Sequence, residues 1–229
     1  MILKSIYLYI EAPDWPRRER YFVTKSTRYI LNYLERAILK PLKFNVDGFN
    51  RIVINLTPTG SSELVSTNSE RVLCVDIPFL DRIKKYRDGV IPPDVTKELI
   101  LLGLRLADSY HTLPVEKIEH GLSSFIEQGA LNTWQLGKKI IPGIKVELSL
   151  VCELNSKCFK LDLLSRKDGI LFDRRTVLET DPDEVAFAYK CGDVGLVGDN
   201  IVITQKSGSV LSKIPVSELL EEATKQDIA

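Results

Sequence analysis

The chain contains 229 residues, of which 44% are hydrophobic and 27% charged, and its 31 basic residues equal its 31 acidic ones in number. This is the composition of an ordinary globular protein, and it excludes a wholly disordered chain. The balanced charge disfavours nucleic acid as the partner, because nucleic-acid-binding domains carry a strong positive excess. The N-terminus has no secretory pattern and no apolar run approaches a membrane span, so we expect a cytoplasmic protein without membrane contacts.

The first part of the chain mixes strand and helix patterns. Residues 2–10 alternate between apolar and polar side chains, which predicts a strand. The period becomes helical over residues 24–40, and Pro41 is expected to end that helix. Residues 51–56 and 71–77 are rich in valine and isoleucine and are predicted strands, joined by a polar loop.

The middle of the chain is helical and the last part is rich in strands. Residues 94–110 and 114–128 have apolar side chains at helical spacing. Clean alternation then predicts antiparallel strands over 144–154, 157–164 and 170–178, joined by hairpin turns.

Shorter strands are expected near residues 185–189 and 201–205, and a last helix follows from Ser217. We therefore predict an α+β fold with an N-terminal α/β part, a helical middle and a C-terminal antiparallel β-meander with a terminal helix. A boundary between residues 1–136 and 137–229 fits this pattern. One continuous domain over residues 1–229 fits it equally well.

The sequence contains no recognisable catalytic, metal or cofactor motif. It lacks a nucleophile elbow, a phosphate-binding loop, a dinucleotide fingerprint and the paired ligand spacings of zinc sites. Its two histidines, His111 and His120, stand apart from any cluster. We therefore assign no catalytic residue, no metal ligand and no cofactor.

Positive charge is concentrated between Arg17 and Lys43, where eight basic residues accompany only two acidic ones. On the helix predicted over 24–40, the basic residues lie opposite the apolar stripe and tyrosines border them. Arginine and tyrosine anchor many protein interfaces, and basic residues beside aromatic rings also suit nucleic acid. The candidate basic surface consists of Arg17, Arg18, Arg20, Lys25, Arg28, Tyr29 and Arg36. A solvated helix face explains the same pattern without a partner.

A second candidate surface is acidic and lies in the stretch ETDPDE. Its residues are Glu179, Asp181, Asp183 and Glu184. Such a surface suits a basic partner protein. A solvated turn between strands is the alternative.

Trp15 lies between Pro13 and Pro16 in the stretch EAPDWPRRERYF, directly before the arginines. The prolines disfavour helix around it. Trp15 is therefore either an aromatic anchor of the basic surface or a core residue.

The profile resembles the immunity proteins of bacterial polymorphic-toxin systems, on the strand-first opening MILKSIYLYIEA, the charge-patterned surface and the lack of catalytic motifs. The resemblance implies a non-enzymatic protein that binds one cognate toxin domain and occludes it. It assigns no binding residue. Two alternatives stay open. One is an enzyme whose site is assembled from dispersed residues such as Asp76 and His111, and the other is a nucleic-acid-binding module that uses the helix over 24–40.

Overall fold

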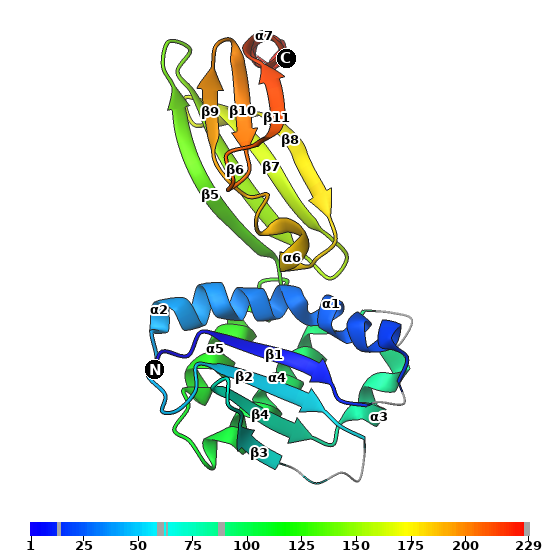
Figure 1. The fold of residues 1–229 in the computed structure, drawn as a ribbon. Coiled ribbons are helices and arrows are strands. Elements are labelled where there is room, and N and C mark those ends of the chain that lie inside the picture. Colours follow the sequence, from blue (N-terminus) through cyan, green and yellow to red (C-terminus); the bar gives the residue numbers. More distant parts are fainter. Residues whose placement is uncertain (13–14, 59–61, 63, 87–89, 227–229) are drawn as a thin grey trace. The chain divides into compact units, whose positions relative to one another are not determined.

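The chain divides into two compact units, Met1–Asn132 and Thr133–Ala229, which Figure 1 shows in the computed structural model. The structure describes residues 1–12, 15–58, 62, 64–86 and 90–226. Helices and antiparallel strands occur together, so the predicted α+β class is confirmed. No helix within the described ranges is long and apolar enough to cross a membrane.

A four-stranded sheet forms the centre of the first unit, in the order β1-β2-β4-β3. Its strands are β1 (Ser5–Ile10), β2 (Arg51–Leu56), β3 (Leu64–Thr67) and β4 (Val72–Ile77). Strands β1, β2 and β4 are parallel, and β3 pairs antiparallel with β4. The segment that forms β3 was predicted as part of a polar loop. One face of the sheet is fully buried, as the row Leu8, Ile54 and Val75 shows.

Helices cover that buried face, and Figure 1 shows α4 and α5 behind the sheet. The helices are α1 (Arg17–Tyr33), a π-helical turn (Leu34–Leu39), α2 (Lys40–Leu42), α3 (Leu80–Ile83), α4 (Pro93–Asp108) and α5 (Val115–Glu127). The ring of Tyr33 stacks on Phe125 with centroids 3.9 Å apart, which joins α1 to α5. The helix α4 comes so close to β2 that a methyl group at Gly103 would lie 2.7 Å from Ile54.

The first helix is longer than the sequence predicts. It begins at Arg17 rather than Thr24, because Pro16 has a non-helical ψ of 137° and is the N-cap. The helix also continues through Pro41, which lacks a backbone N–H and crowds the preceding turn. The wider π-helical turn directly before Pro41 accommodates this ring. Lys43, with a φ of 47°, then ends the helix.

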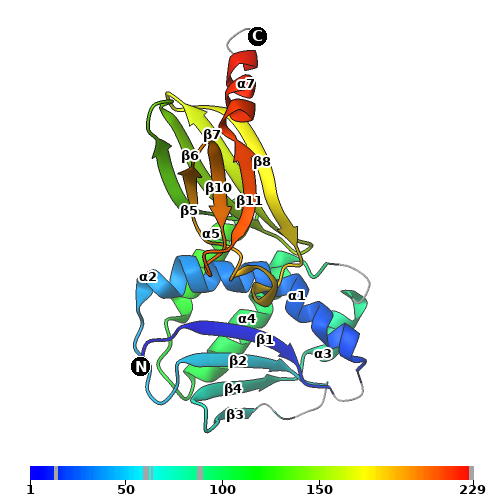
Figure 2. The same ribbon diagram turned by 45° about the horizontal axis from the view of Figure 1, so that its top comes forward.

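The second unit is built from two antiparallel sheets, ordered β5-β6-β7-β8 and β11-β10-β9. In Figures 1 and 2 the three-stranded sheet lies in front of the four-stranded sheet. The strands are β5 (Asn132–Ile141), β6 (Val146–Leu154), β7 (Phe159–Lys167), β8 (Ile170–Thr180), β9 (Val194–Val197), β10 (Asn200–Thr204) and β11 (Val210–Pro215). The chain closes with α7 (Val216–Gln226), so the predicted antiparallel strands with a terminal helix are confirmed.

One predicted strand of this unit is wrong. The segment 185–189 belongs largely to a short helix, α6 (Glu184–Phe187), rather than to a strand. Asp183 directly before it accepts a hydrogen bond from the first turn, and this cap favours helix over strand. The ring of Phe187 stacks on Phe159 with centroids 3.9 Å apart, which fixes the helix to the sheet.

Candidate functional site

A hollow of about 240 Å³ lies beside the start of α1, where two arginines meet two tyrosines. Its walls are Tyr9, Arg17, Arg20, Tyr21 and Thr24, and we call it the arginine pocket. Tyr9 is 44% exposed and Tyr21 is 47% exposed, so both rings are open to solvent. Strand β1 supplies Tyr9 and helix α1 supplies the other four walls.

The local sequence explains this arrangement. Arg17, Arg20, Tyr21 and Thr24 are separated by three, one and three residues, so they lie on one side of a helix with 3.6 residues per turn. Strand β1 is at the edge of its sheet, and its alternation directs Tyr9 away from the buried face. The edge strand and the helix side therefore form the two walls of one hollow.

Among the described residues, no ion pair compensates the positive charge of the arginine pocket. Arg17, Arg18 and Arg20 make no ion pair with any residue that the structure describes. The Nε atom of Arg20 is buried and has no hydrogen-bond partner among the residues that the structure describes. The N-terminus of α1 adds the positive end of the helix dipole, and Pro16 supplies no side-chain cap. This corner is therefore complementary to an anionic group.

The side chains of the arginine pocket are binding groups. A guanidinium group binds a carboxylate through two parallel hydrogen bonds, and tyrosine adds contact area with a polar tip. The geometry suits recognition of an anion.

No family model, curated protein or solved structure matches this chain. The function is therefore inferred from the residues and from where the fold places them. Of the seven residues in the predicted basic surface, the fold brings Arg17 and Arg20 together in the arginine pocket and leaves Arg18 exposed beside them.

The predicted basic surface does not continue along α1 as one open strip. Arg28 is only 8% exposed, lies over the ring of Tyr7 at 5.2 Å and pairs with Glu35 at 3.2 Å. Arg36 donates a hydrogen bond of 2.8 Å to Asn132. All six residues from Ser26 to Leu31 are buried, so this part of α1 is covered on every side and Arg28 does not lie on an open basic face. The helix over 24–40 therefore offers nucleic acid no continuous basic face.

Two further residues of that surface are held by aromatic contacts. The ammonium group of Lys25 lies 5.2 Å from the centre of the Tyr21 ring. Tyr29 is 5% exposed and packs at an angle on Phe125, with ring centroids 6.5 Å apart. Its burial raises the pKa of the Tyr29 hydroxyl to about 12. Tyr29 is therefore a core residue rather than a border residue of an interface.

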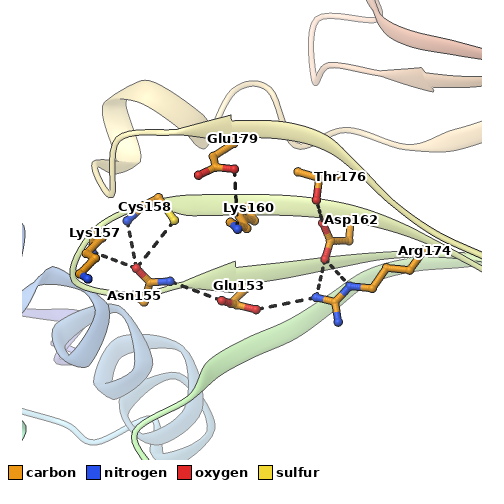
Figure 3. A network of polar contacts seen from close by, with 9 residues as sticks. All are labelled: Glu153, Asn155, Lys157, Cys158, Lys160, Asp162, Arg174, Thr176 and Glu179. Atoms are coloured by element: carbon orange, nitrogen blue, oxygen red, sulfur yellow. Dashed lines mark hydrogen bonds and ion pairs between the residues drawn. The ribbon is translucent and has the colours of Figure 1, made fainter.

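The predicted acidic surface is occupied by contacts within the chain. Asp183 caps α6 by accepting a backbone hydrogen bond of 3.0 Å. Glu179 pairs with Lys160 at 3.7 Å across neighbouring strands, as Figure 3 shows. Asp181 and Glu184 also have interactions with other residues. These contacts account for much of the acidic run, and the arginine pocket is the stronger candidate.

Figure 3 also shows a buried charge on the sheet of the second unit. Asp162 on β7 has 3% of its side chain exposed and accepts hydrogen bonds from Arg174 at 2.7 Å and Thr176 at 2.8 Å. Arg174 also lies 3.8 Å from Glu153. A buried carboxylate with two such partners is satisfied, so this cluster stabilises the sheet and leaves Asp162 little capacity for a ligand.

The alternative of a dispersed active site requires Asp76 and His111 to converge. Asp76 lies near the carboxyl end of β4 and accepts a hydrogen bond of 2.7 Å from Asn55 on β2. His111 contacts Phe49 edge-on at 5.2 Å, and Phe49 precedes the start of β2. Six residues of extended chain separate Phe49 from Asn55, which is roughly 20 Å. The two groups therefore lie at opposite ends of the sheet and do not form one site.

The other titratable groups near Asp76 do not form a reactive centre. Burial raises the pKa of the Cys74 thiol, and the charges of Asp76 and Glu11 raise it further. A raised pKa leaves less of the nucleophilic thiolate at neutral pH. Within the described ranges, no three His, Cys, Asp or Glu side chains are grouped so that they could hold a metal ion.

Sequence reasoning missed Tyr9, Tyr21 and Thr24 as neighbours of the arginines. The alternation of residues 2–10 already directs Tyr9 away from the buried face. The helical spacing from Arg17 to Thr24 was not recognised, because the helix was expected to begin at Thr24. Trp15 is 8% exposed, so of its two interpretations the core residue is the one that burial supports.

Proposed function

We propose that this protein is a non-enzymatic inhibitor that binds one partner protein and occludes it, as the immunity proteins of bacterial polymorphic-toxin systems do. The arginine pocket carries the proposal. It combines exposed tyrosines with arginines that have no ion-pair partner among the described residues, and such side chains are typical anchors of protein interfaces.

The partner is expected to present acidic side chains to this corner. Arg17 and Arg20 would bind a carboxylate at the pocket, and Arg18 beside them would strengthen the attraction at longer range. A stable complex of this kind buries about 800 Å² on each partner. The contact therefore extends well beyond the pocket, and the arginines act as its centre.

Growth rescue tests the proposal. The toxin domain encoded by the neighbouring reading frame is expressed in the bacterial cytosol, with and without this protein. We expect the toxin alone to arrest growth and the wild-type protein to restore it.

The charge-reversed variant Arg17→Glu/Arg20→Glu should restore growth poorly, because it repels the acidic partner. The variant Lys40→Glu/Lys43→Glu is the matched control, since it reverses two exposed charges near the other end of the same helix. Equal rescue by both variants would exclude the arginine pocket as the contact. A neighbouring product that is harmless, or that this protein does not neutralise, would exclude the proposed function.

A further inference from the structure

Two cysteines of the second unit lie side by side in its core, although they are far apart in the sequence. Cys152 is on β6, and Cys191 lies in the connection between α6 and β9. The side chain of Cys152 hydrogen-bonds to that of Cys191, so the two sulfur atoms are neighbours. Both cysteines are free thiols. The pair therefore has the proximity that a disulfide requires.

The alternation of β6 places Cys152 between the two sheets. Leu150, Cys152 and Leu154 follow one another at every second residue, and all three are fully buried. Their side chains therefore lie on the inner face of the four-stranded sheet. Strand β9 of the other sheet contacts β6. A thiol on the inner face of β6 is thus within reach of the chain that enters β9.

Backbone hydrogen bonds on both sides hold Cys191 in this position. The carbonyl of Tyr189 accepts a hydrogen bond of 3.0 Å from the N–H of Lys206. The carbonyl of Asp193 accepts one of 2.8 Å from the N–H of Thr204. The segment around Cys191 is therefore tied to the end of β10, and this presents its thiol to Cys152.

The two thiols differ in reactivity. The hydrogen bond from Cys152 lowers the pKa of the Cys191 thiol, while burial opposes the shift and the charge of Lys206 adds to it. A lower pKa leaves more of the nucleophilic thiolate at neutral pH. Cys191 is 7% exposed and Cys152 is fully buried. A small oxidant from solvent therefore meets Cys191 first.

We propose that Cys152 and Cys191 are an oxidative modification site, which a hydroperoxide such as hydrogen peroxide converts into a disulfide. The Cys191 thiolate attacks one peroxide oxygen, the O–O bond breaks, and the departing hydroxide takes up the proton that Cys191 released. The products are water and a sulfenic acid on Cys191. The sulfur of Cys152 then attacks the sulfur of Cys191, the S–O bond breaks, and hydroxide leaves as water with the Cys152 proton.

This reaction is balanced without a further reactant. Two thiols and one hydrogen peroxide give one disulfide and two water molecules, and the two electrons lost by the sulfur atoms reduce the peroxide. The disulfide would join β6 to the connection that leads into β9. The pair lies in the second unit, whereas the arginine pocket lies in the first. The proposal therefore goes beyond the proposed function, and either can fail without the other.

Peptide mapping of the purified full-length protein tests the proposal. Trypsin separates the four cysteines into the peptides 72–82, 146–157, 158–160 and 191–206. The native protein is treated with hydrogen peroxide, the remaining thiols are alkylated under denaturing conditions, and the digest is analysed by mass spectrometry without reductant. We expect a link between 146–157 and 191–206, at least about tenfold more abundant than any other link and lost after dithiothreitol. Cys152 and Cys191 that stay free thiols, or another main link, would overturn the proposal.

Oxidation in urea is the matched control for the role of the fold. In the unfolded chain Cys152 should pair most readily with Cys158, because the shorter loop costs less entropy to close. In the fold, Cys158 lies in the turn after β6 with its sulfur 3.8 Å from Asn155, as Figure 3 shows. We therefore expect the main link to change from 146–157/158–160 in urea to 146–157/191–206 in native protein. The same main link in both conditions would contradict pairing directed by the fold.

Single variants test the order of attack. Cys152→Ala should leave a sulfenic acid on Cys191 that dimedone traps, and it should form more slowly because the hydrogen bond is lost. Cys191→Ala should leave Cys152 as a free thiol, and Cys158→Ser should form the wild-type link at the wild-type rate. Circular dichroism checks that each variant folds, and the wild-type map needs no variant. A sulfenic acid trapped on Cys152 in Cys191→Ala, formed as fast as the wild-type link, would contradict Cys191 as the attacking thiol.

Discussion

At the scale of single residues, the buried charge of Asp162 depends on one exposed partner. The carboxylate lies on the central strand β7 with 3% of its side chain exposed, and Arg174 is 55% exposed. Replacing Arg174 with alanine leaves the carboxylate buried beside Thr176 alone. We expect Arg174→Ala to lower the free energy of unfolding by about 2–3 kcal/mol, because an unpaired buried charge is costly. Urea unfolding measures the change.

The matched control for that prediction is Lys160→Ala on the same strand. Its ion pair with the exposed Glu179 spans 3.7 Å, and such surface pairs contribute little. We expect a loss below about 0.5 kcal/mol. Equal losses in the two variants would show that burial of Asp162 does not matter to the pair.

Tyr29 gives a pH-dependent prediction. Its hydroxyl has a pKa of about 12 in the fold and an ordinary pKa near 10 when unfolded. The contribution of the neutral Tyr29 hydroxyl to the free energy of unfolding is therefore complete below pH 10. It is lost as the pH rises towards 12. Between pH 8 and pH 11, the free energy of unfolding of the wild type should fall by about 1 kcal/mol more than that of Tyr29→Phe. Identical pH dependence of the two proteins in urea unfolding would contradict the buried hydroxyl.

The same residues show what sequence can establish at this scale. The concentration of basic residues identified Arg17 and Arg20 as candidates, and the alternation of β1 directs Tyr9 away from the buried face. Spacing could not show that Arg28 turns onto Tyr7, because that contact joins a helix to a strand and depends on packing.

At the scale of elements, the contact between α4 and β2 depends on Gly103. An added methyl group would meet three atoms of the buried Ile54 side chain at 2.7–2.8 Å. Alanine favours helix by about 1 kcal/mol over glycine, but overpacking costs about 1–3 kcal/mol. We expect Gly103→Ala to destabilise the protein by about 1 kcal/mol net, as measured by urea unfolding.

A double-mutant cycle checks the cause. In an Ile54→Ala background the added methyl group has room, so Gly103→Ala should be neutral or stabilising there. An equal loss in both backgrounds would place the strain elsewhere.

Element types were easier to predict than element ends. The alternating and helical periods identified β1, β2, β4, α4 and α5, because each buries one regular face. The short strand β3 and the edge strand β5 were missed, since their side chains are largely exposed and carry no clean alternation. The start of α1 was missed because arginines fill its first turn and give no apolar period.

At the scale of the whole molecule, each unit has its own core. The first unit buries one face of its mixed sheet under helices, and the second buries the inner faces of two antiparallel sheets. We expect the fragments 1–132 and 133–229 each to unfold cooperatively, with native-like circular dichroism. A fragment without a cooperative transition would show that its fold depends on the other unit.

The sequence placed the two candidate surfaces in different halves of the chain but could not rank them. The ranking follows from the contacts that each surface already makes within the chain. Asp183 and Glu179 have roles within the second unit, whereas Arg17 and Arg20 have no ion-pair partner among the described residues. The central claim is therefore that the arginine pocket binds the acidic surface of a partner protein.

The affinity of the purified protein for the product of the neighbouring reading frame tests this claim most directly. Calorimetry at moderate salt should show tight binding by the wild type and by Lys40→Glu/Lys43→Glu. The variant Arg17→Glu/Arg20→Glu should bind at least about a hundredfold more weakly, which corresponds to a loss of about 2.7 kcal/mol. A dissociation constant of Arg17→Glu/Arg20→Glu within about twofold of the wild type would contradict the claim.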